Sequence, residues 1–225
     1  MKETQTGPCP VLWQTPFGDL WADWENEATL EMLVDEQQER RFYQNDNVAV
    51  EPGDVVVDIG GHLGTFTAAA LQKGAAQVVV FEPDPANIVC LEQSFADEIR
   101  QGRVHLVEAA AWHEPGILRF RSDENTVMSR VEASGDLEVR ATTVDIEVNR
   151  LGLDQLDFLK MDIEGAERHA LAGARETLAH FAPSMAICVY HKLDDPEVVA
   201  EVVLDARPDY TTYKTREIHY FDIAN

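Results

Sequence analysis

The sequence predicts a doubly wound α/β fold with a mainly parallel sheet and an antiparallel closing strand. The first observation is a run of β-branched residues, 55–59, that leads directly into a glycine-rich turn, 60–64, and then into a helix-forming segment, 65–71. Strand, tight turn and helix together form the first unit of such a sheet. The second observation is that further apolar strands alternate with helices, which indicates parallel strands joined by right-handed crossovers. The third is that acidic side chains end several of these strands.

The chain begins with a leader that precedes this alternation. A polar start containing Gly and Pro predicts an arm, and apolar segments on both sides of Pro16 predict a small hairpin. A weakly amphipathic pattern predicts a helix over 27–43, with Asn26 as its N-cap. We expect this leader, residues 1–47, to cover the ligand cleft of the main domain, residues 48–225.

The main domain contains the alternating elements in a regular order. Asp84 followed by Pro85 is typical of a helix start, because Asp caps and Pro fits the first helical turn. We expect buried strands over 55–59, 77–82, 104–107, 157–162 and 185–190, and helices over 65–71, 84–99, 164–181 and 197–206. Short strands over 117–120 and 137–143 should enclose a polar loop, 122–135, and a closing antiparallel pair is predicted over 210–214 and 219–221.

Composition restricts the classes of partner. The 225 residues carry 18 Lys and Arg against 41 Asp and Glu, a net charge of −23. Such a surface repels phosphate backbones, so we expect no nucleic-acid partner. The charge is typical of a highly soluble protein or of one from a salty cytoplasm, and a second interpretation is attraction of cationic ligands. No apolar run approaches the ~20 residues of a spanning helix, so we expect no membrane partner.

Cysteine usage and the start of the chain indicate the compartment. Cys9, Cys90 and Cys188 are odd in number and show no paired spacing, which favours reduced thiols over a disulfide frame or a zinc cluster. The first residues lack the apolar region of a secretory signal. We therefore expect a cytoplasmic protein.

One ligand site is expected beyond the carboxyl ends of the strands, where parallel α/β sheets bind their ligands. The residues predicted to stand at those ends are Asp58, Glu82, Ala109, Asp162 and His191.

The glycine turn and the two acids before and after it suggest which ligand binds. The turn has Gly60 and Gly64 four residues apart, which differs from the G-x-G-x-x-G of dinucleotide folds. Glu82 lies about 20 residues further on, where an acid grips the two hydroxyls of a ribose. Asp58 suits a ligand with an amino group better than a pyrophosphate. S-adenosyl-L-methionine has an amine, a ribose diol and an adenine in that order. Two alternatives remain: a nicotinamide dinucleotide, or acids that only cap and stabilise loops.

A second group of charged residues surrounds the end of the 157–162 strand. Strand alternation places Lys160 and Asp162 on the same side, and Glu164 follows closely. A lysine could simply pair with neighbouring carboxylates. At a strand end beside a ligand cleft, however, clustered Lys, Asp and Glu favour a functional site.

These segments resemble the FkbM-type S-adenosylmethionine-dependent methyltransferases. The matching segments are 56–64 (VVDIGGHLG), 81–85 (FEPDP), 142–145 (TTVD), 158–167 (FLKMDIEGAE) and 171–174 (LAGA), within about 48–190. The 158–167 block is the specific one, because the first two occur across many methyltransferases. Two departures are Val144, where a leucine is more usual, and Tyr190-His191-Lys192, where many members carry an acid.

The resemblance implies a class I methyltransferase fold, which is Rossmann-like, and methyl transfer to an oxygen of a sugar, polyketide or other small natural product. It therefore implies a hydroxylated small-molecule substrate. A homo-oligomer is possible. By this likeness the cofactor-binding positions are Asp58, Gly60, Gly61, His62, Gly64, Thr65, Glu82, Pro83, Ala110 and Asp162, with Ala110 on the adenine side. A catalytically silent partner subunit that only binds the cofactor is the alternative, and an NAD-type oxidoreductase is a further one.

Methyl-transfer chemistry suggests the catalytic residues: His191, Asp162, Lys160 and Glu164. The sulfonium carbon is already electrophilic, so the protein mainly aligns donor and acceptor. His191 is the expected general base, since an unperturbed histidine has a pKa near neutrality. Asp162 could orient the substrate, or Asp162, Glu164 and His191 could together hold a divalent metal. His62 is expected to pack beside the cofactor, and the other histidines are expected to be structural or on the surface.

Overall fold

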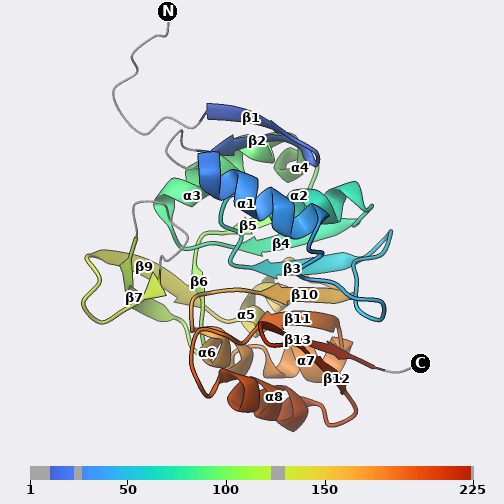
Figure 1. The fold of residues 1–225 in the computed structure, drawn as a ribbon. Coiled ribbons are helices and arrows are strands. Elements are labelled where there is room, and N and C mark those ends of the chain that lie inside the picture. The colour runs from blue at the N-terminus through green and yellow to red at the C-terminus, as the bar shows by residue number, and fades with distance from the viewer. Residues whose placement is uncertain (1–10, 23–26, 123–129, 224–225) are drawn as a thin grey trace, which may run out of the picture.

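The central feature of the fold is a seven-stranded sheet. The computed structural model describes residues 11–22, 27–122 and 130–223. Within these residues the strand order is β12-β13-β11-β10-β3-β4-β5 (Figure 1). The strands are β3 (Val55–Ile59), β4 (Gln77–Phe81), β5 (Val104–Val107), β10 (Phe158–Met161), β11 (Ser184–Cys188), β12 (Thr211–Lys214) and β13 (Ile218–Asp222). Neighbours from β11 to β5 pair in parallel, whereas β13 is antiparallel to both β11 and β12. The predicted parallel sheet with an antiparallel closing strand is confirmed.

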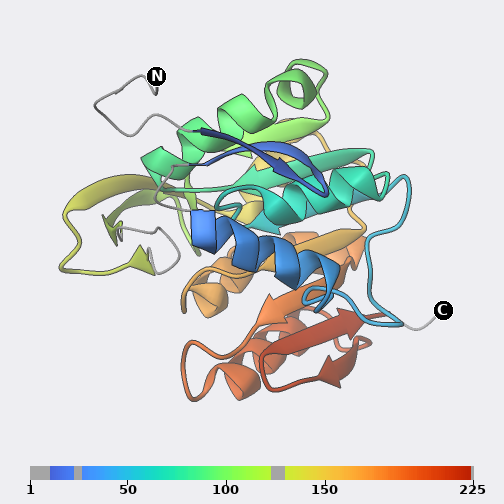
Figure 2. The ribbon, with the colours of Figure 1, turned by 45° about the horizontal axis from the view of Figure 1, so that its top comes forward.

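Helices cover both faces of this sheet, because successive strand residues point to opposite sides. Val56, Val78 and Val80 pack in a core with the leader. That core lies under the hairpin β1 (Val11–Thr15) and β2 (Gly18–Ala22) and under the helices α1 (Glu27–Gln38), α2 (Thr65–Gln72), α3 (Pro85–Ser94) and α4 (Ala96–Arg100). Val57 and Val79 pack in the opposite core, with α5 (Val144–Leu151), α6 (Glu167–Ala172), α7 (Arg175–Phe181) and α8 (Asp195–Ala206). Figures 1 and 2 show the first group of helices and the hairpin on one side of the sheet.

A second, four-stranded sheet projects at one side of the molecule (left in Figure 1). It consists of β6 (Ala110–Ala111), β7 (Gly116–Arg121), β8 (Arg130–Val131) and β9 (Leu137–Thr142). The strands expected over 117–120 and 137–143 are therefore present. The expected loop over 122–135 is shortened by β8, and its residues 123–129 lie outside the described ranges.

Three expected helices are shorter or divided, because tertiary contacts interrupt the helical pattern. The predicted helix 27–43 ends at Gln38, and Arg41 has a positive φ of 48°. The predicted helix 84–99 is broken at Phe95, which is buried beside the glycine turn and has non-helical dihedrals (φ −113°, ψ 24°). The predicted helix 164–181 is divided at Gly173, where a Cβ atom would collide with the carbonyl oxygen of Trp112.

Local signals at helix starts had a mixed outcome. Asp84 caps α3 as expected, since its carboxylate accepts a hydrogen bond from the backbone N–H of Ala86 (3.0 Å) and Pro85 is the first helical residue. The expected N-cap Asn26 lies outside the described residues. Cys90 and Cys188 are both buried, and Cys9 also lies outside the described residues. None of the described helices combines the length and apolarity needed to cross a bilayer.

Candidate active site

A cavity of about 300 Å³ lies at the carboxyl ends of the parallel strands, where the sequence predicts a site. This volume is at the lower end of the range for small-molecule sites, about 300–1,000 Å³. Four parts of the chain line it: α1, the glycine turn, the ends of β4, β10 and β11, and the second sheet. The lining residues used below are Met32, Leu33, Glu36, Tyr43, Gly60, Gly61, His62, Thr65, Glu82, Pro83, Asn87, Ala110, Lys160, Asp162, Glu164 and Tyr190.

The glycines of the turn are required by close packing of the chain on itself. Gly60 has a φ of 87°, and a Cβ atom there would collide with the carbonyl oxygen of Asp162. A Cβ atom at Gly61 would collide with Val80, and one at Gly64 would collide with the ring of Phe95. Gly64 does not line the cavity. The glycines are thus needed for packing within the chain, and the cofactor contacts expected for Gly60, Gly61 and Gly64 stay predictions.

The backbone N–H groups of the turn are already engaged. Those of Gly60 and Gly61 both donate to the carbonyl oxygen of Phe81, at 3.0 and 3.1 Å. The N–H of His62 donates to the Glu82 carboxylate (2.8 Å). A phosphate cradle needs such groups free to point at the ligand. This turn therefore does not offer the pyrophosphate site of a dinucleotide fold.

Asp58 is buried behind the cavity, where it pairs with Lys160. The two residues are register partners on neighbouring strands, and Lys160 Nζ lies 3.1 Å from Asp58 Oδ1. Thr67 donates a hydrogen bond to the other carboxylate oxygen (2.7 Å). Asp58 is fully buried and does not line the cavity, and the contact expected between its carboxylate and a ligand amine stays a prediction.

Lys160 lines the cavity as a cation. Burial alone would lower its pKa, but the carboxylates of Asp58 and Asp162 outweigh burial and raise the pKa of the ammonium group. Its Nζ also donates to the carbonyl oxygen of Gly60 (2.6 Å), and it lies 5.2 Å from the centre of the Tyr43 ring. Lys160 thus holds the strand end and the turn together, in addition to any role toward a ligand.

Glu82 reaches the cavity from the end of β4, with Pro83 and Asn87 beside it. Its carboxylate accepts hydrogen bonds from the N–H of Asp84 (2.9 Å), the N–H of His62 (2.8 Å) and the amide of Asn87 (3.3 Å). Burial raises the pKa of Glu82 to about 7, although these donors act against the shift. The expected grip on a ribose stays a prediction, as do the cofactor contacts expected for His62, Thr65, Pro83 and Ala110, all of which line the cavity.

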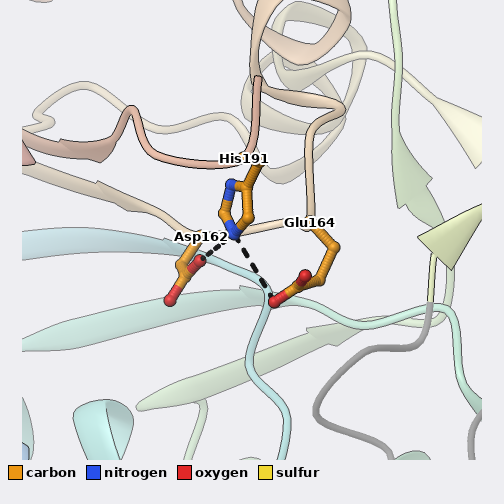
Figure 3. A group of neighbouring side chains, drawn as sticks. All are labelled: Asp162, Glu164 and His191. Atoms are coloured by element: carbon orange, nitrogen blue, oxygen red, sulfur yellow. Dashed lines mark ion pairs between the residues drawn. The ribbon is translucent and has the colours of Figure 1, made fainter. Parts of the chain in front are cut away.

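Asp162 and Glu164 line the cavity, and His191 lies beside them without lining it (Figure 3). His191 Nε2 lies 3.5 Å from Asp162 Oδ1 and 3.5 Å from Glu164 Oε1. His191 lies three residues beyond the end of β11 at Cys188, rather than at the strand end itself. Glu164 has a positive φ of 54°, a strained conformation for a residue with a side chain. The three residues expected to act together are therefore neighbours.

The state of His191 differs from the expectation of an unperturbed histidine. Burial opposes its charge, but the carboxylates of Glu164, Glu167 and Asp162 raise the pKa of His191 to about 10. With only these partners the imidazole is protonated at neutral pH and has no lone pair to accept a proton. The expected pKa near neutrality is wrong, and with it the physical argument for His191 as a general base.

Two site residues were missed by the sequence reasoning. Tyr43 donates a hydrogen bond through its hydroxyl to Asp162 Oδ2 (2.6 Å). Glu167 is fully buried, and its Oε1 lies 2.9 Å from His191 Nδ1. The same Glu167 oxygen accepts hydrogen bonds from the N–H groups of Ile163 (3.1 Å) and Gly165 (3.3 Å). The acid in the Glu-Gly-Ala-Glu segment could have signalled Glu167, whereas no local pattern marks Tyr43.

The leader contributes a wall of the cavity. Met32, Leu33 and Glu36 of α1 line it together with Tyr43. Burial, followed by the charge of Asp162, raises the pKa of Glu36. A lid-like role for this helix remains a prediction.

Comparison with known proteins places these features in one family. The family model described as methyltransferase FkbM domain matches residues 58–212. The chain is 29% identical over 146 residues to the 2-O-methyltransferase NoeI of Sinorhizobium fredii, covering 57% of this chain and 60% of that protein. It is 23% identical over 186 residues to the 31-O-demethyl-FK506 methyltransferase FkbM of Streptomyces tacrolimicus, covering 67% of this chain and 71% of that protein. The match to NoeI thus spans less than two thirds of that relative.

Solved structures show the same fold. The crystal structure of methyltransferase FkbM from Methylobacillus flagellatus superposes with a TM-score of 0.62 at 21% identity, covering 89% of this chain and 55% of that one. Fibrillarin from Aeropyrum pernix, solved with bound S-adenosyl-L-methionine, superposes with a TM-score of 0.50 at 10% identity, covering 97% and 84%. At these identities the likeness shows the fold alone, and it confirms the predicted class I methyltransferase architecture.

Proposed function

Since the chain belongs to the methyltransferase FkbM domain family, we propose that it transfers a methyl group from S-adenosyl-L-methionine to a hydroxyl group of a small organic molecule. The observation that carries this proposal is the cavity at the strand ends. It joins the family's characteristic segment 158–167 to the glycine turn and to Glu82. A hydroxyl acceptor is supported by the two relatives, one of which is a 2-O-methyltransferase and the other a 31-O-demethyl-FK506 methyltransferase.

The cavity suits S-adenosyl-L-methionine better than a nicotinamide dinucleotide. The turn offers no free run of N–H groups for a pyrophosphate, because those of Gly60, Gly61 and His62 have partners. Glu82 presents its carboxyl group to the cavity. Of the about four lone-pair sites of a carboxylate, three accept from His62, Asp84 and Asn87, so one is left for a ribose hydroxyl and a second becomes available if the 3.3 Å contact with Asn87 is given up. We expect Glu82, Pro83 and Ala110 to hold the nucleoside. When bound, the cofactor supplies an electrophilic methyl group.

The acidic end of the cavity would hold the acceptor. The carboxylates of Asp162 and Glu164 can accept hydrogen bonds from a hydroxyl and fix the direction of its oxygen lone pair. Their negative charge also favours a sulfonium nearby. Leu33 and Met32 of α1 supply an apolar wall against which a small molecule can pack and exclude water. Alignment of donor and acceptor is thus the main contribution we assign to the chain.

Methyl transfer is tested by incubating the protein with methyl-labelled S-adenosyl-L-methionine and a panel of sugars and other hydroxylated compounds. We expect label in at least one hydroxyl compound and none when Asp162 and Glu164 are both changed to their amides. A protein that binds the cofactor but labels no member of a broad panel would favour the alternative of a silent partner subunit.

A further inference from the structure

The group formed by Asp162, Glu164 and His191 has the composition and spacing of a metal site. We propose that these three side chains bind one divalent first-row cation, and that Mn²⁺ and Zn²⁺ are the ions that match this donor set best. The proposal rests on the proposed function, because Asp162 and Glu164 line the same cavity and the ion would contact the acceptor hydroxyl there. Two carboxylates and one imidazole are a donor set that suits such ions.

The two distances from His191 Nε2 are too long for good hydrogen bonds and lie close to the spacing of ligand atoms around a shared ion. His191 Nε2 is 3.5 Å from one oxygen of Asp162 and 3.5 Å from one oxygen of Glu164. Good hydrogen bonds between N–H and a carboxylate are about 2.7–2.9 Å. Ligand atoms that each lie about 2.1 Å from a common ion lie roughly 3.0–3.4 Å from one another. All three donor atoms are within 4.8 Å of each other.

A buried nitrogen points into the group without a hydrogen-bond partner. The His191 side chain is only 7% exposed, and its Nε2 faces the two carboxylates (Figure 3). Among the described residues, neither Nε2 nor Asp162 Oδ1 has a hydrogen-bond partner. A buried polar atom left in this way costs free energy unless a ligand satisfies it. Both atoms belong to the proposed coordination sphere.

Surrounding residues fix the orientation of two ligands. Glu167 Oε1 forms an ion pair with His191 Nδ1 at 2.9 Å, outside hydrogen-bond geometry, and this contact holds the imidazole with Nε2 toward the two carboxylates. This carboxylate–histidine arrangement is the usual support of a metal-bound histidine. The hydroxyl of Tyr43 donates to Asp162 Oδ2 (2.6 Å), which leaves Oδ1 for the ion.

A second group, Glu167, His191 and Asp195, is a weaker candidate. Glu167 Oε1 is used by two backbone N–H groups. Asp195 pairs with Arg168 at 2.5 Å and accepts a hydrogen bond from the N–H of Lys192 (2.7 Å). These carboxylate oxygens therefore have other partners, whereas Asp162 Oδ1 and His191 Nε2 of the first group have no hydrogen-bond partner in the part of the chain that the structure describes.

The ion would activate the hydroxyl group of the acceptor. With three protein ligands on one side, its remaining positions face the cavity, and an acceptor hydroxyl bound there loses its proton to solvent more readily. The resulting oxygen forms the new O–CH₃ bond as the C–S bond of the cofactor breaks, and S-adenosylhomocysteine leaves. A metal-bound His191 would be neutral, with its Nε2 lone pair used by the ion, so the ion rather than the imidazole would activate the acceptor.

The test measures metal binding without any turnover. The protein is freed of metal with a chelator and titrated with Mn²⁺, and the signal of free Mn²⁺ is followed by electron paramagnetic resonance, with Zn²⁺ as a competitor. We expect one tight site per chain that Zn²⁺ displaces. Asp162→Asn and Glu164→Gln should each weaken it at least about tenfold, and Glu167→Gln by about ten- to a hundredfold. Glu114→Gln, a change of an exposed glutamate outside the cavity, should bind Mn²⁺ as the parent does.

Binding of S-adenosylhomocysteine to each variant separates this inference from the proposed function and shows that the variants are folded. A parent protein that binds S-adenosylhomocysteine but neither Mn²⁺ nor Zn²⁺ would overturn the metal site and leave the function standing. Equal Mn²⁺ affinity in the parent and in Asp162→Asn and Glu164→Gln would also overturn it. In a third outcome the parent binds Mn²⁺, the two variants do not, and the parent has no affinity for S-adenosylhomocysteine. This result would support the metal site and refute the proposed function.

Discussion

Glu82 illustrates how one buried carboxyl couples folding to pH. Its pKa is raised from 4.5 to about 7, mainly by burial and in part by Asp84. Between these two values the folded protein keeps the proton, whereas the unfolded chain has lost it. Stability contributed by the neutral form is therefore present at acidic pH and is lost as the pH rises through this window, by on the order of 3 kcal/mol in total.

The first prediction follows from this sign. In urea unfolding at pH 5 and pH 7.5, Glu82→Gln should lose less stability between the two pH values than the parent does, because the amide cannot titrate. Glu92→Gln, on the exposed face of α3, should follow the parent. Parallel pH profiles for the parent and Glu82→Gln would show that Glu82 is not the titrating group.

The second prediction concerns the same residue as a ligand contact. Glu82→Ala should weaken S-adenosylhomocysteine binding by about 1.5–3 kcal/mol, the range for hydrogen bonds to a charged group. Calorimetry compares it with Glu92→Ala, for which no loss is expected. Unchanged affinity in a folded Glu82→Ala protein would refute the ribose assignment.

At the site, the sequence predicted which side chains lie together better than it predicted their protonation states. Asp162, Glu164 and His191 were expected to meet, and they do, because neighbouring parallel strands end at one edge of the sheet. The raised pKa of His191 depends on Glu164, Glu167 and Asp162 together, and Glu164 itself stands in a backbone conformation with positive φ. Tyr43 reaches Asp162 only because the chain turns after α1. Such contacts join residues far apart in the chain, so no local pattern reveals them.

At the scale of the elements, the turn after β3 can be tested with a matched pair of glycines. Gly60 and Gly53 both have positive φ, of 87° and 97°, but only at Gly60 would a Cβ atom collide with another part of the chain. The third prediction is that Gly53→Ala destabilises by about 1–2 kcal/mol from backbone strain, and Gly60→Ala by roughly 1–3 kcal/mol more from overpacking. Equal losses in urea unfolding would contradict the close approach to Asp162.

The element boundaries show which signals act locally. Runs of β-branched residues predicted β3 and β4 well, since such runs form strands wherever they can be buried on both faces. The breaks at Phe95 and Gly173 escaped prediction, because each depends on a distant partner. Phe95 packs on Gly64, and Gly173 lies against the carbonyl of Trp112. The helical periodicity of the sequence continues across both positions, so it does not indicate either contact.

On the scale of the whole molecule, the net charge of −23 should make stability depend on salt. Like charges repel in the compact state, and screening length falls from about 30 Å at 0.01 M salt to about 10 Å at 0.1 M. The fourth prediction is that the free energy of unfolding rises by on the order of 1 kcal/mol over this range, equally in NaCl and KCl. A flat or falling dependence would mean that local ion pairs, such as Arg40 with Glu217, outweigh the repulsion.

The order of strands brings distant segments to one cavity, and the central claim is that this cavity binds the methyl donor. The most direct test is calorimetric titration of the protein with S-adenosylhomocysteine and, separately, with NAD. We predict one S-adenosylhomocysteine bound per chain and no binding of NAD. Binding of NAD in place of S-adenosylhomocysteine, or no heat with S-adenosylhomocysteine, would contradict the account.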